Sequence, residues 1–179
     1  TNRRARKWLS REVNPLSLIA NGALGWVYFY ARRYEDAIAQ CDLALEMAPD
    51  WDLCHIWKGQ AFEELGRRDE AIASLQGAVE LSGGTGISMV ALARAHATFG
   101  EPDRARELLA EMLAAGEYQP SYEIAKVYVA LGEHDRALDW LERACEEHAH
   151  SMAFLKVDPQ LVPLHGNPRF QRLAERVGV

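Results

Sequence analysis

The chain has 179 residues, of which 49% are hydrophobic and 26% are charged, a balance typical of one water-soluble domain with a sizeable core. Its net charge of -6 argues against a protein whose main surface binds nucleic acid. No run approaches the roughly 20 apolar residues that a membrane helix needs, and no leader with a cleavage site is found, so we expect a cytoplasmic protein without a membrane partner.

The first predicted element is a helix over residues 5–15, with an apolar strip of Trp8, Leu9 and Val13. We interpret residues 1–17 as the second helix of a truncated repeat, of the same kind as the repeats that follow. The segment also carries five basic residues against one acidic residue. A basic arm that binds nucleic acid or anionic lipid is therefore the alternative interpretation.

A sequence pattern that recurs about every 34 residues comes next. It reads RRYEDAIAQCDLA, GRRDEAIASLQGA, GEPDRARELLAEM and GEHDRALDWLERA, starting at residues 32, 66, 100 and 132. Acidic residues near the start of each copy favour the first turn of a helix, where free amide groups attract negative charge. The pattern predicts a repeated helix, aligned on Ala37, Ala71, Ala105 and Ala137.

A second predicted helix precedes each of these copies and carries a small residue twelve positions before the aligned alanine. A larger ring follows three positions later, as closely crossed helices require. A glycine that can close a helix in the left-handed conformation follows in three copies, whereas the first has Arg32 there. We therefore predict four helical hairpins, at 18–51, 52–85, 86–117 and 118–149, with small residues Gly25, Gly59, Ala93 and Ala125.

The repeated helix pattern does not continue into the tail over residues 150–179. Three prolines divide the tail into short turns before a last helix from Pro168 to about Val177. A solenoid needs a final element that stops the stacking. We expect the tail to be this cap, with its apolar residues covering the exposed face of the fourth hairpin: Phe154, Leu155, Val157, Leu161, Val162, Leu164 and Phe170.

The four registers resemble the tetratricopeptide repeat family over about residues 18–149. The resemblance implies an all-α, right-handed α-solenoid, with a leftover helix before it and a helical cap after it. The family's early tryptophan is absent from all four repeats, and its closing proline is present only as Pro49. The residues that carry the likeness are Gly25, Tyr28, Ala37, Ala44 and Pro49, then Gly59, Phe62, Ala71 and Ala78, then Ala93 and Ala105, and finally Ala125, Tyr128, Ala137 and Ala144.

A narrower resemblance concerns residues 14–40 and the tail from Phe154. Both are similar to the tetratricopeptide regions at the C-terminal ends of bacterial multi-domain signalling proteins. Their N-terminal partners are winged-helix regulators, nucleotide cyclases or Ser/Thr kinases. This resemblance implies that the chain is part of a larger signalling or regulatory protein.

No residue pattern in the sequence indicates catalysis, a cofactor or a metal. His148 and His150 are two positions apart, which places them on different faces of a helix, and a zinc site needs three or four ligands that converge. The SGGTG segment lacks the lysine of a phosphate-binding loop. We expect the three cysteines to be small buried side chains, namely Cys41, Cys54 and Cys145.

The resemblance implies a concave groove, lined by the first helix of each hairpin, that binds a peptide or protein segment. Aromatic residues at one end of the groove, with Arg94 and Lys126 at the other, suit a partner with an apolar anchor and an acidic group. The alternative for the tryptophans is core packing between repeats. The candidate partner-binding residues are Trp26, Phe29, Tyr30, Trp57, Gln60, Glu63, Arg94, Tyr122 and Lys126.

Two other functions stay open. The apolar strip of the N-terminal helix lacks an upstream neighbour, so a homodimer that pairs through this helix is the main alternative to partner binding. Nucleic-acid binding by the basic segment is the less favoured one.

Overall fold

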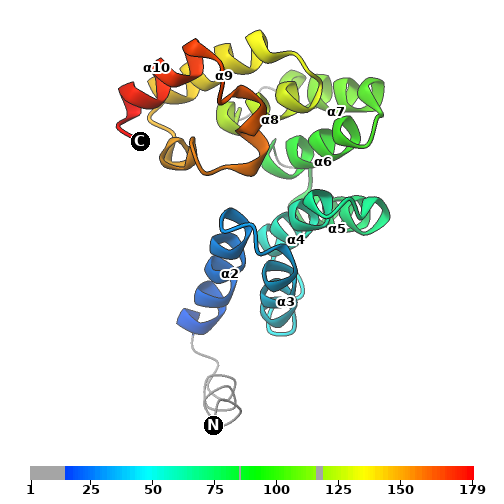
Figure 1. Cartoon of the computed structure of the whole chain (residues 1–179). Helices are drawn as coiled ribbons and strands as arrows, with labels where there is room; N and C mark the ends of the chain where they lie inside the picture. The colour runs from blue at the N-terminus through cyan, green and yellow to red at the C-terminus, as the bar shows by residue number, and fades with distance from the viewer. Residues whose placement is uncertain (1–14, 85, 116–118) are drawn as a thin grey trace.

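The computed structural model describes residues 15–84, 86–115 and 119–179. Within these ranges the chain is helical and contains no strand. Eight α-helices form the hairpins, and two short 3-10 helices and a last α-helix form the tail (Figure 1). Their bounds are α2 Pro15–Tyr30, α3 Tyr34–Leu45, α4 Asp52–Glu64, α5 Arg68–Ser82, α6 Gly86–Thr98, α7 Pro102–Ala114, α8 Ser121–Ala130, α9 His134–Glu146, η1 His150–Phe154, η2 Pro159–Leu164 and α10 Pro168–Val177.

The helices pack as successive hairpins, α2 with α3, α4 with α5, α6 with α7 and α8 with α9. The first helices of neighbouring hairpins also contact one another, from α2 to α4, α6 and α8. This order of contacts is that of a helical-repeat solenoid, with α2, α4, α6 and α8 as its inner row. The predicted all-α solenoid is confirmed.

The predicted small residues lie where the two helices of a hairpin cross. A Cβ added to Gly25 would stand 2.7 Å from the sulfur of Cys41, and one added to Gly59 would stand 2.6 Å from Cγ of Leu75. Ala93 is fully buried in the third hairpin. The aligned alanines of the second helices, Ala37, Ala71, Ala105 and Ala137, are also fully buried.

The turn inside each hairpin repeats one backbone geometry. The amide of the residue directly after the turn's left-handed position donates to a carbonyl near the end of the first helix, as in Glu133 N to Tyr128 O at 2.8 Å. Gly66, Gly100 and Gly132 hold the left-handed position, with φ between 72° and 82°. In the first hairpin Arg32 holds it, at φ 58°. Because Arg32 carries a Cβ, this turn is strained where the other three are not.

The largest apolar core runs from α4 into α10, while two smaller clusters lie in the first two hairpins. Cys41 and Cys54 are fully buried in one of the smaller clusters, as expected, whereas Cys145 is half-buried. The tail extends the main core: Leu155, Leu161 and Leu164 are fully buried in it.

The expected cap therefore forms, but three of its predicted residues do not cover the fourth hairpin. Val157, between η1 and η2, and Val162, within η2, remain about half-exposed. Phe154 packs against α2 of the first hairpin and not against the fourth. The predicted N-terminal helix lies outside the described residues, and α2 itself begins at Pro15, three residues before the predicted start of the first hairpin.

Candidate partner-binding face

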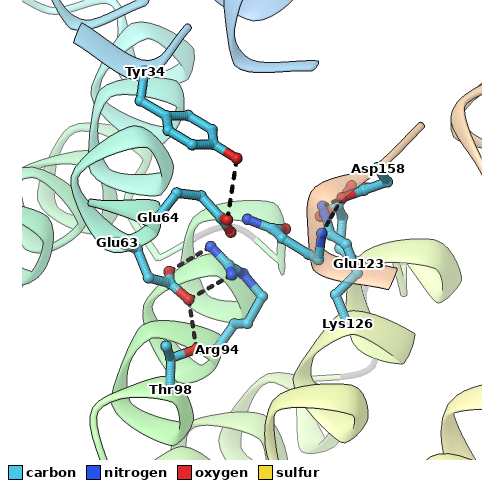
Figure 2. A network of polar contacts seen from close by, with 9 residues as sticks. Tyr34, Glu63, Glu64, Arg94, Thr98, Glu123, Lys126 and Asp158 are labelled. Carbon is cyan, nitrogen blue, oxygen red and sulfur yellow. Dashed lines mark hydrogen bonds and ion pairs between the residues drawn. The ribbon is translucent and has the colours of Figure 1, made fainter. Parts of the chain in front are cut away.

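Residues 150–164 of the tail lie against the inner row of helices. The second part of the segment, η2, packs on α8, and its first part reaches α2 (Figure 1). Figure 2 shows side chains of α4, α6 and α8 there, together with Tyr34 of α3 and Asp158 of the segment. The fourth inner helix, α2, contributes Trp26 and Tyr30, which contact Phe154 of the segment. We call this region the inner face.

An aromatic cluster forms one end of the inner face. The rings of Trp26 and Tyr30, one turn apart on α2, meet edge to face at 5.2 Å between centroids. The ring of Phe154 lies 4.4 Å from Trp26 and is stacked on Tyr30 at 4.6 Å. All three side chains are half-buried. We call the surface that the rings of Trp26 and Tyr30 form together, and that Phe154 covers, the aromatic slot.

Asp158 anchors the other part of the segment. Its side chain is fully buried and accepts hydrogen bonds from the Tyr122 hydroxyl at 2.9 Å and from the backbone amide of Gln160 at 2.9 Å. The ammonium group of Lys126 lies 3.7 Å away and also pairs with Glu123. The carboxylate of Asp158 is thus satisfied from three directions, which offsets the free-energy cost of burying its charge.

A second buried ion pair joins α4 to α6. The guanidinium of Arg94 donates two hydrogen bonds to the carboxylate of Glu63, and the Thr98 hydroxyl donates a third at 2.6 Å (Figure 2). Burial raises the pKa of Glu63 above its ordinary value, and the positive charge of Arg94 acts in the opposite direction. The hydroxyl of Tyr34, 3.3 Å from a Glu64 oxygen, joins the first hairpin to this row.

The inner face carries more negative than positive charge. In the polar network of Figure 2, Glu63, Glu64, Glu123 and Asp158 contribute four carboxylates, whereas Arg94 and Lys126 contribute two cations, each already paired. The exposed Lys156 of the segment adds a third cation. This excess also acts on the tyrosines. Burial, and then the charges of Asp158 and Glu123, raise the pKa of Tyr30 well above its ordinary value, and burial followed by Glu64 raises the pKa of Tyr34 to about 12.

The structure brings six of the nine predicted binding residues to the inner face or its polar network: Trp26, Tyr30, Glu63, Arg94, Tyr122 and Lys126. Trp26 and Tyr30 are half-buried, whereas the other four are buried in ion pairs and hydrogen bonds of the chain itself. Phe29 is a correction, because only 1% of it is exposed and it packs in the core between the first two hairpins. Trp57 packs edge to face on Trp51 at 6.0 Å between ring centroids, which agrees with the alternative that it packs in the core. Gln60 is buried within α4.

Sequence reasoning missed Phe154 and Asp158 as residues of the inner face. It interpreted the segment as a cap of the fourth hairpin, and it expected the apolar anchor and the acidic group on a partner. In the structure both groups belong to the chain itself, because Phe154 fills the aromatic slot and Asp158 meets Lys126. In the sequence, the aspartate before Pro159 indicates only a local turn, and its side chain does cap the short helix η2.

His148, His150 and Cys145 line one shallow cavity with Arg176. Across the described parts of the chain, no three His, Cys, Asp or Glu side chains are placed to share a metal ion. Among the same residues, no helix is both long and apolar enough to cross a membrane.

Comparison with known proteins gives one family. A sequence model of the family described as Tetratricopeptide repeat matches residues 3–50, 58–120 and 90–151. No curated protein matches the chain. Among solved structures, a crystal structure of MamA protein is similar at 17% sequence identity and a TM-score of 0.49, and the match covers 92% of this chain and 88% of that one.

Proposed function

Because this chain belongs to the tetratricopeptide repeat family, we propose that it is an interaction scaffold that binds a segment of a partner protein on its inner face. One observation carries the proposal. The inner face already holds a segment of short 3-10 helices and a turn, residues 150–164, through an aromatic slot and an anchored carboxylate. A surface that positions one such segment has the contacts to position a second beside it.

The charge of the inner face gives the chemistry of that partner. Arg94 and Lys126 are neutralised by carboxylates of this chain, so they do not favour an acidic partner. The excess of carboxylates favours a partner segment with basic residues. The scaffold acts by binding and not by catalysis. Following the resemblance of its two ends, we place it in the cytoplasm, within a larger bacterial signalling or regulatory protein.

Peptide selection tests this function. Displayed random twelve-residue peptides are selected on the immobilised chain, and their affinities are measured by fluorescence anisotropy. We expect the selected peptides to be basic and to bind about ten-fold more weakly to Glu64→Gln, a half-buried change on the inner face.

The matched control is Glu111→Gln, an exposed glutamate on α7 of the outer row, which should leave the affinities unchanged. If no peptide binds specifically, or if Glu111→Gln weakens binding as much as Glu64→Gln does, the proposed function is wrong.

A second candidate function is self-association, which the outer surface of α2 favours. Ile19, Leu24 and Val27 are 61%, 42% and 52% exposed, and they lie along one side of this helix with exposed alanines between them. Apolar side chains gathered in this way mark an interaction surface more often than scattered ones do. A second copy of the chain could bury this face in a symmetric dimer.

Sedimentation velocity distinguishes this candidate. A dimer that becomes a monomer in Leu24→Glu, but persists in Leu81→Glu, would support self-association through α2. Leu81 is a suitable control because it is 46% exposed on a different helix, α5. A wild-type chain that stays monomeric up to about 100 µM removes this candidate.

A further inference from the structure

The contact of Phe154 with α2 differs from the other contacts of its segment. Met152, Leu155 and Asp158 are buried in the cap and around α8, and they hold the backbone on both sides of Phe154. Phe154 itself is half-buried, and its neighbour Ala153 is exposed. Its ring can therefore leave the slot by a rotation of its own side chain while the backbone stays in place.

We propose that the aromatic slot between Trp26 and Tyr30 is the docking site for an aromatic side chain of the partner segment, and that Phe154 occupies it in the free protein. The proposal rests on the proposed function and adds the identity of the anchor. The slot offers one stacked contact, on Tyr30, and one edge-to-face contact, with Trp26, and both are arrangements that aromatic side chains prefer.

The surroundings of the slot specify a second feature of the partner. Asp158 and Glu123 act electrostatically on Tyr30, and both share the single ammonium group of Lys126. The slot therefore lies in a region of negative electrostatic potential. An aromatic residue with a lysine or arginine close to it fits this potential better than one beside a carboxylate. The chain's own segment has this form, Phe154-Leu155-Lys156, with Lys156 exposed.

The probe for this inference is a fluorescein-labelled peptide that copies residues 150–157, HSMAFLKV. Its affinity is measured by anisotropy for the wild-type chain, for Phe154→Ala, which empties the slot, and for the matched control Val157→Ala. Val157 is 51% exposed on the same segment and does not reach the slot. We expect Phe154→Ala to bind the peptide at least ten-fold more tightly than the wild-type chain and the control do.

Two changes to the peptide and one to the protein complete the test. Replacing phenylalanine by alanine in the peptide should abolish binding, and replacing its lysine by glutamate should weaken binding about ten-fold. Adding Trp26→Ala to Phe154→Ala should abolish the gain. Circular dichroism and thermal unfolding verify that each variant is folded, and Trp26→Leu replaces Trp26→Ala if the alanine variant does not fold.

Equal affinity of the peptide for the wild-type chain and Phe154→Ala overturns the inference. The inference is also overturned if the peptide in which alanine replaces phenylalanine binds Phe154→Ala as tightly as the original peptide does. These results are distinct from a failure of the proposed function. If selected twelve-residue peptides bind the inner face but are indifferent to Phe154→Ala and Trp26→Ala, the function stands and the slot is not its anchor.

Discussion

At the scale of single residues, the fold depends on positions where a side chain must be small or absent. The aligned small residues could be identified from the sequence because their spacing alone reveals them. Arg32 could also be identified, since it stands where the other hairpins have glycine. The structure adds which atoms each small residue meets, and these distances decide what a substitution would do.

Arg32→Gly should stabilise the protein. Arg32 is exposed and its φ of 58° is the left-handed conformation that glycine adopts without a Cβ penalty. Relief of this strain is worth about 1 kcal/mol in the free energy of unfolding. Urea denaturation would measure the gain. Arg33→Gly is the control, because Arg33 has φ -96° and no strain to relieve, so it should give no increase.

Gly59→Ala and Gly77→Ala should have opposite effects, although both glycines lie inside helices. A Cβ on Gly59 would stand 2.6 Å from Cγ of Leu75, at a branched carbon that cannot move aside, so we expect a loss of roughly 1 to 3 kcal/mol. A Cβ on Gly77 would meet only His55, at 3.9 Å, and should stabilise α5 by about 0.5 to 1 kcal/mol. Similar melting temperatures for the two variants would contradict the crossing of α4 and α5.

At the scale of elements, the inner helices are joined by buried charges and not by apolar contacts alone. The sequence placed Glu63 and Arg94 on the inner faces of consecutive hairpins, but it gave no reason to pair them. Their side chains meet because α4 and α6 pack side by side, which is a tertiary contact. A buried pair of this kind fixes the register of its two helices more than it adds stability.

Arg94→Ala alone should be strongly destabilising, by about 3 to 5 kcal/mol, because Glu63 would remain buried without its partner. The double variant Glu63→Leu with Arg94→Met should recover most of this loss, since apolar residues of similar size replace the pair. Denaturant unfolding of Glu63→Leu, Arg94→Met and the double variant forms the necessary cycle. Strictly additive losses would show that the two residues do not interact.

At the scale of the whole molecule, the hairpins were predictable from the sequence and the course of the tail was not. Each hairpin is specified by nearby residues, through periodicity and turn glycines. The contact of Phe154 with Trp26 joins residues near opposite ends of the chain, and it exists only because the stacked hairpins curve enough to bring them together. That curvature depends on small angles between hairpins, which composition and spacing leave undetermined.

Ion pairs that lower the pKa of glutamates should make the molecule sensitive to acid. Hydrogen bonds from Arg169 lower the pKa of Glu142, and those from Arg136 and Arg106 lower the pKa of Glu133. A carboxyl with a lowered pKa stabilises the folded state above its unfolded pKa of about 4.3, and this contribution is lost as the pH falls through the folded value.

Arg169→Ala should therefore reduce the loss of stability between pH 6 and pH 3, because it removes the main cause of the shift at Glu142. Urea midpoints at these two pH values measure the effect. Arg104→Ala is the matched control, since Arg104 and Glu107 form an exposed pair within one helix. An acid sensitivity unchanged by Arg169→Ala would show that α10 is held by its apolar side chains alone.

The reach of Phe154 back to α2 has a mechanical consequence. A solenoid in which each repeat contacts only its neighbours is easily extended or compressed along its axis. In this chain the ring of Phe154, from the tail, contacts α2 of the first hairpin, so the two ends of the row of hairpins are joined directly. Tension applied between α2 and the tail would therefore load this stacked bridge as well as the crossings of the helices.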